Sequence, residues 1–159
     1  NKLCNRKSLA RVSSTPGKTA TINFYQLDTC YLVDLPGYGY AKVSGAERQR
    51  WDDLINSYFE TPRHRGLLLQ LLDSRHAPSA DDMQMLEYLQ YHGIAFVVVL
   101  TKGDKLTKSQ QQQVVEEFRQ ICSPYGCVDV LLTSAEKGQG IDQLKELLDK
   151  TLEETQSGR

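Results

Sequence analysis

Residues 94–101 (IAFVVVLT) limit the possible folds more than any other part of the chain. The segment is apolar and rich in β-branched residues over the length of a strand, and it shows no alternation with polar residues. This pattern predicts a strand that is covered on both faces. Such strands belong to parallel sheets, in which the connecting helices lie on the two faces. The rest of the chain should therefore supply helices and further strands.

Turn residues and helical periodicity divide the rest of the chain into alternating elements. Residues 21–27 and 30–34 predict two strands, and the short link Asp28-Thr29 between them permits only a hairpin. The first helix should begin at a capping box of Ser44 and Glu47, followed by apolar residues on one face. The other predicted elements are strands at 66–73, 94–101 and 128–133 and helices at 79–92, 107–122 and 141–152.

This order predicts a single α/β domain over residues 1–159. A hairpin followed by strand–helix units gives a mostly parallel sheet with one antiparallel hairpin and helices on both faces. A chain of 159 residues is long enough for the core of such a domain. Ligands of these folds bind beyond the carboxyl ends of the strands, so a functional site is expected there.

Composition excludes several classes of function. The net charge of −1 gives no overall field that attracts nucleic acid or an anionic membrane. No apolar run approaches the roughly 20 residues of a membrane span. The cysteines at positions 4, 30, 122 and 127 lack metal-ligand spacing and fit reduced thiols of a cytoplasmic protein. The glutamines at 110–113 fit a solvated helix face. The start of the chain is basic, which fits either a contact with RNA phosphates or a solvated helix end; its cations are Lys2, Arg6, Lys7, Arg11 and Lys18.

The strand ending at Asp34 runs into the glycine-rich turn of YLVDLPGYGYAKVS. Asp34 is suited to hold a magnesium-bound water, and Gly37 can offer its amide to a terminal phosphate because no Cβ obstructs the approach. An Asp-x-Pro-Gly turn also follows many strands that bind nothing, so both interpretations remain open. Upstream, a hydroxyl of the polar loop at 13–19 could complete magnesium coordination, although its composition favours an ordinary surface loop.

Two further strands end in polar residues. After the buried strand come Thr101, Lys102, Gly103 and Asp104, where a carboxylate can accept both hydrogen bonds that guanine offers from N1 and N2. A solvated turn is the alternative, but the position at the end of a buried strand favours a function. The last strand is followed by Ser134-Ala135, which means little alone. The order of the three groups along one αβ array is what predicts a guanine-nucleotide site.

Four segments carry a close resemblance to a known family: RVSSTPGKTATINFY, YLVDLPGYGYAKVS, LLDSRHAPSADDMQML and VVVLTKGDKL. They resemble the EngB (YihA/YsxC) family of bacterial ribosome-assembly GTPases, and the similarity covers nearly the whole chain. The resemblance implies a Ras-like P-loop GTPase fold that binds GTP and GDP with Mg²⁺. It also implies a protein that acts in large ribosomal subunit assembly and is required for normal cell division and septation. The protein is expected to be cytoplasmic, and a monomer is the default expectation for its oligomeric state.

The resemblance assigns the nucleotide site residue by residue. Thr19 matches the switch I threonine that ligates magnesium, Asp34 begins the switch II motif, and Asp104 ends the guanine-specificity motif. No catalytic residue is assigned, and His76 is expected to order its surroundings without acting as a base. The residues assigned to the nucleotide are Gly17, Lys18, Thr19, Ala20, Thr21, Asp34, Leu35, Pro36, Gly37, Thr101, Lys102, Gly103, Asp104, Thr133, Ser134 and Ala135.

The sequence departs from the family pattern at its start. No window has the phosphate-cradle form G-x-x-x-x-G-K-[ST], and family members carry that loop, with a first strand, ahead of the segment matching Asn1. We therefore expect the chain to be an N-terminally incomplete GTPase domain. The absent strand would lie between those ending at Asp34 and Asp73, which should leave an open apolar seam.

Hydrolysis is expected to be slow. Tyr38 stands where Ras-like GTPases carry the glutamine that orients water, so ribosomal particles are expected to accelerate the reaction. Two other interpretations predict different observations. A non-hydrolysing RNA- or ribosome-binding scaffold with a degenerate nucleotide site would bind RNA without nucleotide. A flavodoxin-like domain would carry flavin, and it gives no reason for the TKGD segment.

Overall fold

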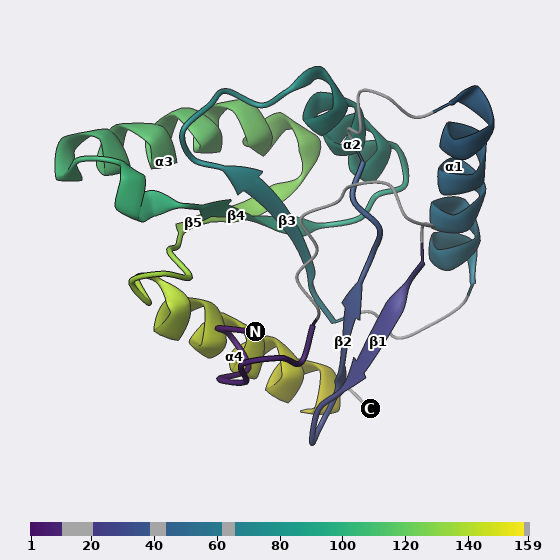
Figure 1. The fold of residues 1–159 in the computed structure, drawn as a ribbon, viewed down its shortest axis with the longest axis horizontal. Helices are drawn as coiled ribbons and strands as arrows, with labels where there is room; N and C mark the ends of the chain where they lie inside the picture. Colours follow the sequence, from purple (N-terminus) through teal and green to yellow (C-terminus); the bar gives the residue numbers. More distant parts are fainter. Residues whose placement is uncertain (11–20, 39–43, 62–65, 158–159) are drawn as a thin grey trace. The chain divides into compact units, whose positions relative to one another are not determined.

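The computed structural model describes residues 1–10, 21–38, 44–61 and 66–157. They fall into two compact units, one of residues 1–7 and 65–159 and one of residues 8–64. In chain order (Figure 1), the elements are β1 (Asn23–Gln26), β2 (Tyr31–Asp34), α1 (Gly45–Glu60), β3 (Leu68–Asp73), α2 (Ala80–Tyr91), β4 (Phe96–Thr101), the 3-10 helix η1 (Gly103–Lys105), α3 (Lys108–Cys122), the 3-10 helix η2 (Ser123–Tyr125), β5 (Cys127–Leu132) and α4 (Ile141–Ser157).

The larger unit is built on a parallel sheet with the strand order β3-β4-β5. Strand β4 pairs with both neighbours, so that Asp73 lies opposite Thr101 and Val98 lies opposite Val130. The predicted parallel arrangement is confirmed. Because the strands are parallel and in this register, their carboxyl ends meet at one edge of the sheet, where the polar segments after β3, β4 and β5 begin.

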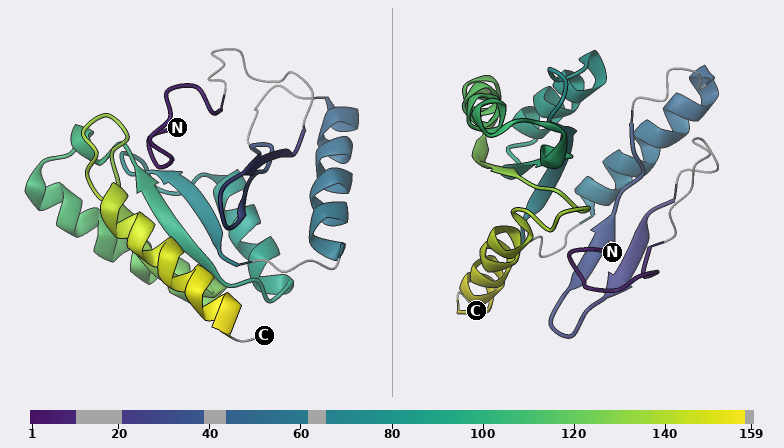
Figure 2. Two further views of the ribbon diagram at one scale, coloured as in Figure 1. Left: turned by 90° about the horizontal axis from the view of Figure 1, so that it is seen from below. Right: turned by 60° about the vertical axis from the view of Figure 1, so that its left-hand side comes forward.

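Strand β4 is buried on both of its faces, as its sequence predicts. Val97 and Val99 pack with Leu144 of α4 on one face. Successive strand residues point to opposite sides, so Val98 and Leu100 point to the other face. Helices α2 and α3 cover that second face (Figures 1 and 2). Each residue from 96 to 100 is at most 2% exposed, which makes β4 the rigid centre from which the following loop emerges.

Three helices begin at complete capping boxes. The boxes of Ser44 with Glu47 and of Thr107 with Gln110 confirm the predicted helix starts. A third box, Ser79 with Asp82 at the start of α2, was not predicted because aspartate replaces the usual glutamate or glutamine. These caps satisfy amides of the first helical turn that have no partner within the helix. They therefore fix where each connecting loop ends.

The smaller unit contains the predicted hairpin and α1. Strands β1 and β2 pair antiparallel, with Asn23 opposite Asp34 and Gln26 opposite Tyr31. Strand β1 is shorter than the predicted 21–27, because pairing ends where the chain turns after Gln26. In the described residues the hairpin forms a sheet of its own, separate from β3-β4-β5.

The last helix and the sheet edges complete the fold. Helix α4 runs to Ser157, beyond the predicted end at 152, because residues 153–157 carry neither a glycine nor a proline to stop it. In the three-stranded sheet β3 is an edge strand, and its Leu71 is 62% exposed. Among the described residues, no helix is long and apolar enough to cross a membrane.

Candidate functional site

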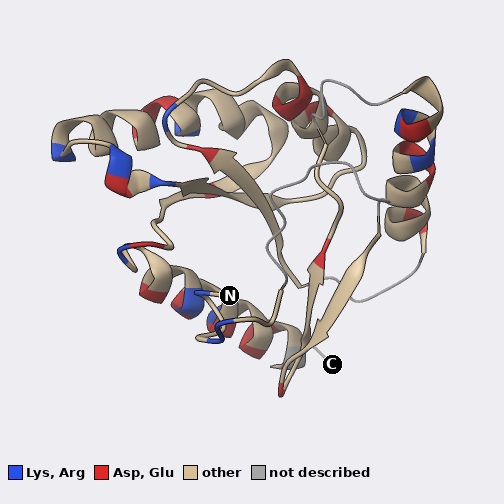
Figure 3. Ribbon diagram, in the orientation of Figure 1, with Lys and Arg blue, Asp and Glu red and all other residues tan. Residues whose placement is uncertain are grey.

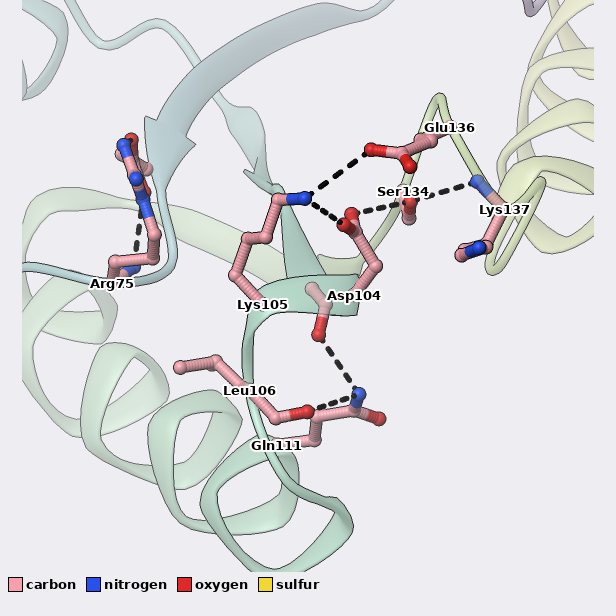
Figure 4. Close-up of polar contacts among 10 residues, drawn as sticks. Arg75, Asp104, Lys105, Leu106, Gln111, Ser134, Glu136 and Lys137 are labelled. Atoms are coloured by element: carbon pink, nitrogen blue, oxygen red, sulfur yellow. Dashed lines mark hydrogen bonds and ion pairs between the residues drawn. The ribbon is translucent and has the colours of Figure 1, made fainter.

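The loops after β4 and β5 meet through a bond between two side chains. Ser134 Oγ donates a hydrogen bond of 2.6 Å to Asp104 Oδ1, and the backbone N–H of Lys137 donates to the same serine oxygen at 3.0 Å. Figure 4 shows Asp104 between Ser134 and Lys105. Ser134 is fully buried and the Asp104 side chain is only 7% exposed. The predicted specificity motif and the Ser-Ala loop therefore form one structural group.

Asp104 is held as a carboxylate. The Ser134 hydroxyl lowers the pKa of Asp104, and Lys105 lowers it further. Lys105 Nζ lies 3.1 Å from Asp104 Oδ2 and 3.3 Å from Glu136 Oε2. An ionised carboxylate has only acceptor sites, so a ligand facing Asp104 must present N–H or O–H donors.

Backbone hydrogen bonds fix the two loops to the ends of their strands. The Gly103 amide donates to the carbonyl of Thr133 at 2.9 Å, and the Thr133 amide donates to the carbonyl of Leu100 at 2.7 Å. A side chain at Gly103 would meet Leu132, which explains why a glycine stands between the lysine and the aspartate. Gly140 has φ +70°, and a Cβ there would collide with the carbonyl oxygen of Leu132.

Helix α3 supports the same loop through Gln111. Its Nε2 donates to the carbonyls of Gly103 and Leu106 at 2.8 and 3.2 Å (Figure 4). The Oε1 of Gln111 accepts a hydrogen bond of 2.9 Å from Gln139 Nε2. The prediction that the glutamine run is a solvated face is therefore wrong for Gln111, although Gln110 and Gln112 are exposed. Nothing in the sequence separates Gln111 from its neighbours except the phase of the helix.

A second polar cluster lies at the ends of β3 and β4. Arg75 Nε and Nη2 donate to the two oxygens of Asp73 at 2.9 and 2.8 Å, and Lys102 Nζ lies 2.9 Å from Oδ2. Arg75 and then Lys102 hold the pKa of Asp73 far below its ordinary value. No sequence pattern assigns a role to Arg75, and the structure identifies Asp73 as its partner. The exposed His76 donates its amide to the carbonyl of Asp73 at 3.4 Å.

The predicted switch II motif lies in the smaller unit. Asp34 is exposed at the end of β2, where its Oδ2 accepts a long hydrogen bond of 3.4 Å from Asn23. The carbonyl of Pro36 accepts a hydrogen bond of 2.9 Å from the indole N–H of Trp51 in α1. The ring of Tyr38 packs edge-on against Trp51 with ring centroids 6.2 Å apart. The turn is therefore tied to α1, a contact that no sequence pattern predicts.

The structure describes some of the remaining predicted residues and leaves the others outside the described ranges. Thr21 is exposed just before β1, and Leu35 and Gly37 belong to the turn after β2. Ala135 is exposed beside the buried Ser134. The predicted ligands Gly17, Lys18, Thr19 and Ala20 lie outside the described residues.

The described residues also limit how a metal can be held. They contain no group of three or more His, Cys, Asp or Glu side chains suited to a metal ion. Mg²⁺ in nucleotide sites takes only one or two protein oxygens and keeps phosphate and water as its other ligands. The exposed carboxylate of Asp34 suits such a partial contact, so the donor chemistry fits.

The basic start of the chain adjoins a helix of mixed charge. Leu3 packs with the cluster that includes Leu144 of α4, and the side chain of Lys2 lies near Gly138. Figure 3 shows acidic and basic residues interspersed along α4. Mixed charge attracts RNA less than a continuous basic patch does, so this arrangement gives little support to an RNA-binding scaffold.

Comparisons with known sequences match this chain to GTP-binding proteins. The family described as 50S ribosome-binding GTPase matches residues 1–102. The probable GTP-binding protein EngB of Bacillus subtilis (strain 168) is 44% identical over 144 residues, covering 90% of this chain and 74% of that protein. The protein of the same description from Pelotomaculum thermopropionicum is 43% identical over 149 residues, covering 93% of this chain and 75% of its own.

Comparison with solved structures agrees on the fold. A crystal structure of a probable GTP-binding protein engB has a TM-score of 0.76 at 20% identity and covers 96% of this chain and 90% of that one. Translation elongation factor SelB from Methanococcus maripaludis, in complex with the GTP analogue GppNHp, has a TM-score of 0.62 at 22% identity. It covers 85% of this chain and 28% of that one. At these identities the likeness establishes the small GTPase fold, which confirms the predicted fold class.

Proposed function

The chain belongs to the EngB family of GTP-binding proteins, and we propose that its guanine-reading group is Asp104. The observation that carries this proposal is the almost buried Asp104 carboxylate, with Ser134 on one oxygen and Lys105 on the other. The proposed base-binding residues are Thr101, Lys102, Gly103, Asp104, Thr133, Ser134 and Ala135.

The chemistry of the base explains the expected selectivity. Guanine presents two adjacent donors, N1–H and the C2 amino group, and a carboxylate can accept from both. Adenine has no donor at N1 and no C2 amino group, so its binding would leave Asp104 desolvated and unpaired. A site that loses such buried contacts rejects the wrong ligand by roughly 10⁴-fold or more. The small side chains of Ser134 and Ala135 leave room for a base to approach the loop.

The phosphate end of the proposed site uses the turn after β2 and the segment from Gly17 to Thr21. The amide of Gly37 would donate to the terminal phosphate, with Leu35 and Pro36 setting the shape of the turn. The hydroxyl of Thr19 would hold Mg²⁺, and the carboxylate of Asp34 would hold a magnesium-bound water. When bound, Mg²⁺ neutralises charge on the phosphate oxygens.

We propose that GTP hydrolysis by this protein is slow until a partner acts on it. Tyr38 has no amide group with which to orient water as a glutamine does. Its ring also packs on Trp51, which supports a role in anchoring the turn to α1. The partner we propose is the large ribosomal subunit or its precursor, including its RNA and proteins. The description of the matching family as a 50S ribosome-binding GTPase supports that choice.

The proposed cellular role follows from this proposed partner. As a GTP-dependent factor in large-subunit assembly, the protein would act in the cytoplasm as a monomer with one GTPase domain. A failure of ribosome assembly would impair growth, and normal division and septation would depend on the protein for that reason.

Calorimetric titration of the purified protein with GDP, GTP and ATP in the presence of Mg²⁺ tests the proposal. We expect GDP and GTP to bind and ATP to show no heat of binding at the same concentrations. Equal binding of ATP would overturn the assignment of Asp104 as the base-reading group. Absence of binding by all three nucleotides from a folded sample would overturn the nucleotide-binding function itself.

A further inference from the structure

We propose that Asp73 is a positioning residue for guanine recognition, because its carboxylate fixes the ammonium group of Lys102 in the base-reading loop, which we define as residues 102–106. Lys102 stands two residues before Asp104, so its methylene stem can lie along the face of a base whose edge Asp104 reads. The inference rests on the proposed function and adds a residue that acts through Lys102, without itself touching the base.

The pairing of β3 with β4 brings the two residues together. Asp73 lies opposite Thr101 in the parallel register, and Lys102 follows immediately. Two more hydrogen bonds lock these strand ends: the amide of Ser74 donates to the carbonyl of Thr101, and the Thr101 hydroxyl donates to the carbonyl of Leu72, both at 3.1 Å. The 2.9 Å contact between Lys102 Nζ and Asp73 Oδ2 therefore spans two fixed backbones.

The backbone of Lys102 is in the left-handed region, with φ 62° and ψ 29°. A residue with a Cβ occupies that region at an energetic cost, and such residues gather at functional sites whose surroundings hold them in place. The conformation turns the chain out of β4 immediately before Gly103 and Asp104. The Lys102 side chain remains 52% exposed although its ammonium is paired. Its stem is therefore open to a flat ligand.

Arg75 orients the carboxylate of Asp73, which in turn pairs with Lys102. Asp73 Oδ1 accepts from the amide and from Nε of Arg75 at 3.0 and 2.9 Å, and Oδ2 accepts from Arg75 Nη2 at 2.8 Å. This two-oxygen contact fixes the rotation of the carboxylate, since a guanidinium matches a carboxylate in only a few orientations. Because Arg75 fixes the carboxylate of Asp73, Oδ2 meets the ammonium group of Lys102 from a defined direction.

If Lys102 is ordered before the nucleotide binds, the affinity of the site for the base increases. An unpaired lysine side chain samples many rotamers and loses that freedom when a base packs on its stem. The Asp73 contact removes part of that freedom before the nucleotide arrives, which reduces the entropic cost of binding.

A double-mutant cycle tests whether Asp73 acts through Lys102. Asp73→Asn is measured for GDP affinity in the wild-type and in the Lys102→Met background, by calorimetry on the full protein. We expect it to weaken GDP binding about tenfold in the wild type, in the range of one charge-assisted hydrogen bond. In the Lys102→Met background the same change should have no further effect. The matched control is Asp129→Asn, which removes a strand carboxylate that is paired with Arg119 and is not one of the proposed base-binding residues, and it should leave GDP affinity unchanged.

Three outcomes would overturn the inference. Equal weakening in both backgrounds would show a structural effect on the strand ends, and no weakening in the wild type would show that the pair has no role in binding. In both cases wild-type GDP binding persists, so the proposed function stands. A wild-type protein that binds no GDP would overturn both together.

A measurement without an Asp73 variant covers the case in which that variant does not fold. Side-chain NMR of the nucleotide-free wild-type protein reports the mobility of lysine ammonium groups, and Lys102→Met assigns the signal. We expect the Lys102 ammonium to be more ordered than that of Lys108, which is exposed at the start of α3. Equal mobility of the two groups would overturn the inference.

Discussion

Among single residues, Asp104, the proposed base-reading group, should have the most direct effect on which base is bound. Asp104→Asn keeps one oxygen acceptor but replaces the other with an NH₂ donor that faces the C2 amino group of guanine. We expect the variant to lose its preference for GDP over ADP, a change of several orders of magnitude on the scale of buried polar contacts. Xanthine carries a carbonyl at C2, so XDP should bind the variant better than GDP does.

Competition binding with GDP, ADP and XDP measures this change. Glu136→Gln is the matched control, since it alters a second contact of Lys105 but leaves the Asp104 carboxylate in place. The control should keep the preference for GDP. If Asp104→Asn still prefers GDP over both competitors, the base is read elsewhere.

Also at the residue scale, the pH dependence of stability should identify Asp73. Arg75 and Lys102 hold the pKa of Asp73 below its usual value of 3.8 in the folded protein. A folded pKa that is depressed stabilises the folded state above the unfolded pKa, and this contribution is lost as pH falls toward the folded pKa. The free energy of unfolding should therefore decline more steeply in wild type than in Asp73→Asn as pH decreases from about 5 to 2.

Urea denaturation at a series of pH values gives the two curves. We expect the wild-type advantage to be constant between neutral pH and about pH 5, and to shrink below that. Parallel curves over the whole range would contradict the ion pairs seen at the end of β3.

At the scale of elements, α3 supports the loop that carries Asp104. Gln111 bonds two loop carbonyls, so Gln111→Ala should lower the free energy of unfolding by about 1–3 kcal/mol, the usual cost of leaving such groups unpaired. Because the loop carries Asp104, the affinity for GDP should fall as well. Chemical denaturation and GDP titration measure the two effects.

The neighbouring glutamine gives the control for that change. Gln112 is exposed on the same helix, so Gln112→Ala should alter the free energy of unfolding by less than about 0.5 kcal/mol. A similar loss for both variants would mean that a general effect of removing a helix glutamine, and not the loop contact, accounts for the effect of Gln111→Ala.

At the scale of the whole molecule, the proposed activity depends on a partner. We expect addition of large-subunit precursor particles to raise the rate of GTP hydrolysis, because we expect contacts with the particles to place the turn after β2 for hydrolysis. Phosphate release with and without the particles measures this effect, with small ribosomal subunits as the control. A rate that does not change with the precursor would argue against the proposed partner.

The sequence predicts the architecture better than it predicts the support of the site. The unbroken apolar run of β4 and the caps of α1 and α3 contain their own structural signals, so they could be identified directly. The contact of Lys102 with Asp73 joins residues 29 positions apart, and it depends on the register of two strands. Register follows from packing and not from any local pattern, which is why this contact could not be predicted. The bond of Trp51 to Pro36 is of the same kind.

The hydrogen bond between Trp51 and Pro36 allows the turn to be followed by the intrinsic fluorescence of the protein. The chain contains a single tryptophan, and its indole N–H is bonded to the turn that follows Asp34. Indole emission responds to the loss of a hydrogen bond and to the polarity around the ring. A movement of the turn away from α1 should therefore change the fluorescence of the unlabelled protein. Stopped-flow mixing with GTP can then follow the turn in real time, with every photon from the indole coming from one position in the fold.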